Sequence, residues 1–303
     1  MKSKNLIRIV CAAAALASLS LPVWGQQRYP GEPYHDSGTS ITGAFEGWYP
    51  SPDGSGYSFL VGYFNRNLRE AIDIPIGPDN KIEPGGPDRG QPTHFLPGRQ
   101  WGMFVIKVPK TFTVNDNVTW SITVNGQTTQ IPLDIKPDWA ILPFRDANDN
   151  TPPYLSFQSF NENGKVAQGP GAIELTKTAT VGAPVELTVW AADDAVVPPG
   201  NRPLKGPPVT ITWRTLRGSD AEVKFDPAKP VVEKQELKLP GVATFGGKAS
   251  TKVTFSKPGD YTLWVTANDV SGEGGRGFQC CWTIGYVRVS VKAGAGGATS
   301  GGN

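Results

Sequence analysis

The sequence has little histidine, little cysteine and no excess of charge of one sign. Two histidines and three cysteines stand in 303 residues, so histidine-based catalysis and histidine-rich metal sites have few ways to form. The 29 basic and 27 acidic residues leave a formal net charge of +2. Such a balance does not attract nucleic acid or an anionic membrane. We therefore expect no nucleic-acid partner.

The first 25 residues have the pattern of a secretory signal peptide. Three basic residues precede an apolar stretch over 9–21, and Val23 and Gly25 suit a cleavage site before Gln26. The stretch is shorter than the roughly 20 residues that span a membrane, although an uncleaved anchor is the alternative. We expect a mature protein without a transmembrane segment, exported to the periplasm or the extracellular space.

The mature chain keeps two cysteines, Cys280 and Cys281, which are adjacent. Export permits disulfides, and neighbouring residues of a strand point to opposite faces. The pair is therefore either two thiols on opposite faces or a vicinal disulfide, a candidate redox site. Neither arrangement is a disulfide framework, so a packed core must hold the fold together.

Strand patterns dominate the sequence, and no apolar helical period persists over three turns. In the first half, short aromatic and β-branched runs over 56–64, 101–108 and 118–124 are bounded by Gly, Pro or Asn. Asn125-Gly126 follows the third run, and this dipeptide favours the type I′ turn of a β-hairpin. A second series of such runs follows at 185–191, 209–213, 249–255, 261–267 and 281–291.

The two series predict an all-β protein of two tandem immunoglobulin-like β-sandwiches. Trp120 and Trp213 each stand in a strand where a large indole can fill the centre of a sandwich. The expected parts are a first sandwich over 38–142 with a long Pro/Gly-rich loop at 75–98, a linker over 143–169, a second sandwich over 170–292 and a flexible Gly-rich tail over 293–303.

Oxygen-bearing side chains crowd one part of the linker. They are Asp146, Asn148, Asp149 and Asn150. Calcium takes about six to eight oxygen ligands, and clusters of Asp and Asn supply them. The alternative is that these side chains cap turns in a solvated linker.

This linker resembles the Asp-x-Asn-Asp-Asn-x-Pro segment between cadherin repeats, and 259–274 resembles a penultimate cadherin strand with its acidic end. The resemblance implies further calcium ligands at Asp193, Asn201 and Asp269. Ala195 stands where cadherins have a second aspartate. The Pro-Gly-Asp-Tyr pattern is shared with PKD and other bacterial immunoglobulin-like modules, whereas the first domain resembles no family.

Three aromatic residues are expected on one outer sheet face of the second sandwich. Alternation along the last two strands places Trp264, Trp282 and Tyr286 there. An exposed aromatic face marks a contact and can stack on sugar rings. The alternative is that the first domain or its long loop covers this face.

The sequence predicts a non-catalytic binding, adhesion or structural protein, with calcium as the candidate ion at its linker. Its expected partners are other extracytoplasmic proteins or a polysaccharide. The alternative is a carbohydrate-binding accessory protein or a hydrolase that uses the aromatic face or the loop over 75–98. A hydrolase would need His94 to meet a carboxylate such as Asp88, but Asp88 and Arg89 are expected to be solvated.

Overall fold

The computed structural model describes residues 35–160, 165–171, 173–194, 208–219, 221–235, 245–274 and 279–294. The predicted signal peptide and the predicted tail beyond residue 294 lie outside these ranges. The described residues form one compact unit. The described part is all-β apart from a short 3-10 turn, η1 (Pro137–Trp139). No helix in it is long and apolar enough to cross a membrane.

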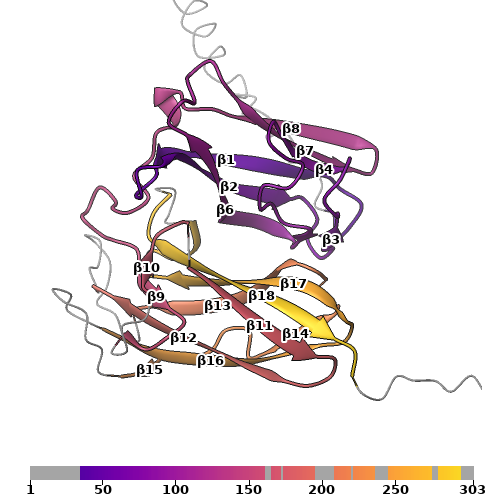
Figure 1. Cartoon of the computed structure of the whole chain (residues 1–303), viewed down its shortest axis with the longest axis vertical. Coiled ribbons are helices and arrows are strands. Elements are labelled where there is room, and N and C mark those ends of the chain that lie inside the picture. Colours follow the sequence, from indigo (N-terminus) through magenta and orange to yellow (C-terminus); the bar gives the residue numbers. More distant parts are fainter. Residues whose placement is uncertain are drawn as a thin grey trace, which may run out of the picture. The chain divides into compact units, whose positions relative to one another are not determined.

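The first sandwich contains two antiparallel sheets, with the strand orders β1-β2-β6 and β4-β7-β8, and a short pair β3-β5 (Figure 1). The strands are β1 (Ile41–Pro50), β2 (Gly56–Asn65), β3 (Ile72–Asp73), β4 (Asn80–Glu83), β5 (His94–Phe95), β6 (Gly98–Pro109), β7 (Val118–Val124) and β8 (Gln127–Leu133).

The second sandwich pairs a sheet of order β10-β9-β12-β16-β14, extended by β15, with a sheet of order β11-β18-β17-β13. Its strands are β9 (Tyr154–Ser156), β10 (Ala167–Gln168), β11 (Ile173–Thr180), β12 (Val185–Asp193), β13 (Thr210–Arg217), β14 (Val223–Asp226), β15 (Glu233–Lys234), β16 (Phe245–Phe255), β17 (Gly259–Asn268) and β18 (Trp282–Lys292). Strand β11 runs parallel to β18, whereas the other pairs of these sheets are antiparallel.

The predicted sandwich architecture and its local signals are confirmed. Asn125 and Gly126 join β7 to β8 with φ of 52° and 75°, the left-handed values that a type I′ turn requires. Trp120 and Trp213 are both buried, each among the large side chains of its own sandwich. Phe104 packs edge-on against Trp120 with ring centroids 5.3 Å apart.

Two predicted irregular segments contain strands instead. The linker expected over 143–169 includes β9 and β10, and β9 pairs with β12 in the second sandwich. The loop expected over 75–98 includes β4, whose residues Asn80 and Ile82 are buried in alternation. These three strands are short and lie close to prolines, so the composition gave no clear strand signal.

The two sandwiches share buried side chains and are not independent domains. Leu216, Trp264, Trp282 and Ile284 of the second sandwich belong to the hydrophobic cluster that fills the first. Trp282 lies directly over Gly102 of β6, where an added Cβ would approach its ring to 2.5 Å. The hydroxyl of Tyr286 donates to the carbonyl of Met103. We call this contact between β6 and the β17–β18 pair the joint.

Removing the Trp282 ring should destabilise the whole protein. We expect Trp282→Ala to lower the free energy of unfolding by about 3 to 5 kcal/mol, because it leaves a large cavity in the joint. Chemical unfolding followed by circular dichroism measures the change. The matched control is Trp139→Ala, since Trp139 is 50% exposed. Equal losses in the two variants would contradict a buried joint.

Candidate functional site

The predicted calcium ligands of the linker do not converge on one point. Oδ1 of Asp146 accepts hydrogen bonds from the backbone amides of Asn148 and Asn150, at 2.7 and 3.0 Å. This is the turn-capping role that the sequence left open. The side chain of Asp149 is 84% exposed and lies 3.5 Å from the guanidinium of Arg145.

Asn150 and Asp269 do meet, although they lie far apart in sequence. The Asn150 amide donates to Oδ2 of Asp269, while Oδ1 of Asp269 accepts the backbone amide and the hydroxyl of Ser271. Burial raises the pKa of Asp269, and the nearby Asp194 carboxylate raises it further.

Of the predicted calcium ligands, the structure brings Asn150 and Asp269 into contact. Asp193 is buried, and Asn201 lies outside the described residues. In the part of the chain that the structure describes, no group of three or more His, Cys, Asp or Glu side chains is placed to hold a metal ion.

Cys280 and Cys281 form a vicinal disulfide, the second of the two arrangements that the sequence allowed. Both residues are buried, and Cys281 has a left-handed φ of 100°. Its Sγ lies 3.5 Å from the carbonyl oxygen of Asn150. The disulfide therefore packs against the linker, immediately before the strand that carries Trp282.

The prediction of an exposed aromatic face is wrong for its two tryptophans. Trp264 and Trp282 are 3% and 2% exposed, whereas Tyr286 is partly buried. Alternation correctly placed the three side chains on one outer sheet face, but β6 of the first sandwich covers that face. The alternative drawn from the sequence is the one that the structure shows, and buried indoles cannot stack on a sugar.

A cleft of about 390 Å³ opens beside the joint and is lined by both sandwiches. Its size falls within the range of small-molecule sites. The first sandwich contributes Asp88 and Arg89, together with Phe104 and Lys107 of β6. The second sandwich contributes Glu174, Leu216, Arg217, Thr262, Tyr286 and Arg288.

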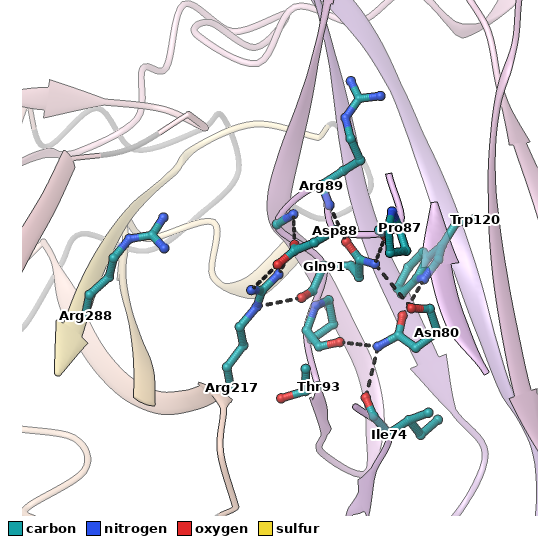
Figure 2. Close-up of polar contacts among 12 residues, drawn as sticks. Ile74, Asn80, Pro87, Asp88, Arg89, Gln91, Thr93, Trp120, Arg217 and Arg288 are labelled. Carbon is teal, nitrogen blue, oxygen red and sulfur yellow. Dashed lines mark hydrogen bonds and ion pairs between the residues drawn. The ribbon is translucent and has the colours of Figure 1, made fainter. Parts of the chain in front are cut away.

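Two arginines of the second sandwich form paired contacts within this cleft. Arg217 donates to both carboxylate oxygens of Asp88, at 2.6 and 2.9 Å, and its Nε donates to the Gln91 carbonyl at 2.9 Å (Figure 2). These hydrogen bonds lower the pKa of Asp88, so Asp88 stays ionised. Arg288 likewise donates to both carboxylate oxygens of Glu174, at 3.1 and 3.0 Å.

The loop that presents Asp88 and Arg89 is anchored to the core of the first sandwich. Buried Asn80 accepts the indole N–H of Trp120 at 3.0 Å and donates to two loop carbonyls, at 3.0 and 2.7 Å (Figure 2). Buried Gln91 accepts the backbone amide of Arg89 at 2.8 Å. Core packing therefore fixes the position of two charged residues at the cleft.

Sequence reasoning correctly expected Asp88 to be exposed, but it missed the ion pair of Asp88 and the partial burial of Arg89. The partner of Asp88 is Arg217, which lies 129 residues further along the chain. No local spacing reports a contact of that kind. The one available signal was the length of the Pro/Gly-rich segment, which is typical of functional loops.

His94 does contact a carboxylate, but this carboxylate is not the expected Asp88, and His94 does not line the cleft. Its Nδ1 lies 2.6 Å from Oδ1 of Asp73, across the β3–β5 pair. The residue is 2% exposed. Among the described residues that line the cleft there is no histidine, cysteine or serine.

Comparison with known proteins identifies no family. No family model and no curated protein matches the chain. Among solved structures, a family 123 glycoside hydrolase from Clostridium perfringens aligns at a TM-score of 0.26 and 12% identity, over 47% of this chain and 28% of the hydrolase. The adhesive subunit CfaE of enterotoxigenic Escherichia coli gives 0.23 and 7%, over 87% and 81%.

Domains 4 and 5 of the S-layer protein SbsC give a TM-score of 0.21 and 11% identity, over 84% of this chain and 98% of that one. All of these TM-scores are low, so none of these structures indicates what this chain does.

The buried Asp269 should make stability depend on pH. The pKa of Asp269 is raised above the ordinary 3.8 in the folded protein. Its contribution to folding stability is therefore fully present below pH 3.8 and is lost as the pH rises through the raised pKa. Asp269→Asn stays neutral throughout. We expect its thermal midpoint to fall less than the wild type's between about pH 4 and about pH 7.

Circular dichroism melts at constant ionic strength test this expectation. Asp260→Asn, at an exposed position of β17, is the matched control and should keep the wild-type slope. An unchanged slope in Asp269→Asn would show that the burial of this carboxylate has no energetic consequence.

Proposed function

We propose that this chain is an exported, non-catalytic binding protein that holds its ligand in the cleft between its two β-sandwiches. The observation that carries the proposal is that both sandwiches line one cleft, while buried side chains of the second sandwich pack into the core of the first. The partners expected from the sequence, a polysaccharide or another extracytoplasmic protein, remain the proposed partners.

The joint supports this function because it fixes the walls of the cleft relative to each other. Phe104 of the first sandwich and Tyr286 of the second both line the cleft, and the Tyr286 hydroxyl donates to the backbone carbonyl of Met103 in β6. The Asp88–Arg217 pair adds a second tie across the cleft. Walls that are already in place lower the entropic cost of binding.

The chemistry of the lining favours binding over catalysis. Asp88 is held ionised by Arg217 and hydrogen-bonded to it on both oxygens, and Glu174 is likewise occupied by Arg288. A general base needs a carboxylate that can take a proton near neutral pH. Buried His94 pairs with exposed Asp73, and neither residue lines the cleft.

Filling the cleft should abolish binding without unfolding the protein. Thr262 is a half-buried residue of the lining, and Thr262→Trp places a large ring in the cleft. We expect isothermal titration with galactose trimers and galacturonic acid trimers to show binding of at least one probe to the wild type. The variant should bind that probe at least about tenfold more weakly.

Thr111→Trp, at an exposed position after β6, is the matched control and should bind like the wild type. Retained binding in Thr262→Trp would place the ligand elsewhere, and binding of neither trimer nor of the sulfated disaccharide 3-O-sulfolactose at millimolar concentration would count against the proposal.

A further inference from the structure

The cleft contains more cations than carboxylates. Four basic side chains line it, against two acidic ones, which leaves a local charge of +2 (4 minus 2). The basic residues are Arg89, Lys107, Arg217 and Arg288, and the acidic residues are Asp88 and Glu174. The nearly neutral composition of the whole chain does not reveal this local excess.

Three of the four cations already have a carboxylate partner. Arg217 and Arg288 form the paired contacts described above, and Lys107 lies 2.9 Å from Asp53 outside the lining. Arg89 is the exception. Its guanidinium donates to the carbonyls of Pro84 and Lys107, at 2.9 and 2.7 Å, and among the described residues no carboxylate lies within ion-pair distance of it.

The Arg89 guanidinium is partly desolvated and keeps hydrogen-bond donors that an anion could use. The residue is half-buried, and loss of water around it lowers its pKa. A partly desolvated charge is costly without a counter-ion. An arginine has five N–H donors in a planar fork, and two carbonyl contacts leave donors for a bidentate oxyanion. The carbonyls and the amide contact to Gln91 hold this fork in place.

The rest of the lining suits a hydroxylated ligand. The ionised carboxylates of Asp88 and Glu174 each retain acceptor capacity beyond the arginine contacts. Sugar hydroxyls are donors that can use it, and the Tyr286 ring lines the same cleft. An acidic peptide offers one backbone N–H donor per residue, whereas a sugar ring offers several hydroxyl donors. A volume of about 390 Å³ is the size of a small ligand and not of a folded partner.

We propose that the cleft binds an oligosaccharide that carries a carboxylate or a sulfate group, and that Arg89 pairs with this anion. The inference rests on the proposed function and names the ligand class of the same site. Arg217 and Arg288 neutralise the two carboxylates, which then accept sugar hydroxyls without repelling the anion.

Isothermal titration with four probes tests the proposal. The galacturonic acid trimer carries carboxylates, 3-O-sulfolactose carries a sulfate, the galactose trimer is neutral and tetraglutamate is an acidic peptide. We expect one of the acidic sugars to bind at least about tenfold more tightly than the neutral trimer and than tetraglutamate. Arg89→Gln should weaken that binding at least about tenfold, because one charge-assisted contact is lost.

Two further variants refine the test. One distinguishes the charge of Arg89 from the planar geometry of its guanidinium, and the other is a control outside the cleft. Arg89→Lys keeps the charge and loses the fork, so its affinity should lie between wild type and Arg89→Gln. Arg69→Gln removes an exposed arginine outside the cleft and should bind like the wild type. Thermal midpoints within about a degree of wild type show that these variants fold.

The failures of the two proposals are distinguishable. In one outcome, neutral and acidic sugars bind equally well, and this binding is lost in Thr262→Trp but kept in Arg89→Gln. That outcome overturns the anionic ligand and leaves the cleft as the binding site. Preferred binding of tetraglutamate overturns the sugar class. Acidic-sugar binding that survives both Thr262→Trp and Arg89→Gln overturns both proposals, as does the absence of binding by all four probes.

Discussion

The packing of one indole against one glycine determines how this protein is built. Trp282 lies over Gly102, a position where no side chain fits. The surrounding face of the β17–β18 pair is apolar. Exposing Trp264 and Trp282 to water would lose several kcal/mol of the free energy that their burial contributes to folding. The first sandwich covers that face, so the two sandwiches become one compact unit.

The cleft follows from this joint. Once β6 and β18 are held together, the loop that carries Asp88 and the end of β13 that carries Arg217 come within hydrogen-bond distance. The Asn80–Trp120 contact holds the loop from the side of the first core. Each sandwich thus supports its side of the cleft with a buried aromatic residue, Trp120 in the first and Trp282 in the second.

The sequence predicted the features that depend on local pattern. Alternation and turn chemistry were enough for the strands around Trp120 and Trp213 and for the Asn125–Gly126 turn. Alternation also placed Trp264 and Trp282 on the correct sheet face. It could not tell whether solvent or a second sheet lies over that face, because this depends on how two separate sandwiches pack.

The candidate site was predictable only in part, and for the same reason. The Asp/Asn-rich linker looked like a ligand set, yet Asp146 caps its own turn and Asp149 faces solvent. The charged residues that do converge, Asp88 and Arg217, lie 129 residues apart, in the Pro/Gly-rich segment and at the end of β13. A residue pattern reports what a short segment can do, whereas the cleft depends on which segments the folded core brings together.

The central claim is that the joint makes the two sandwiches one cooperative structure. Differential scanning calorimetry of residues 26–303 tests it most directly. We expect a single transition in which the calorimetric and van't Hoff enthalpies agree. Two resolved transitions, or a calorimetric enthalpy well above the van't Hoff value, would contradict the claim and would show that each sandwich unfolds by itself.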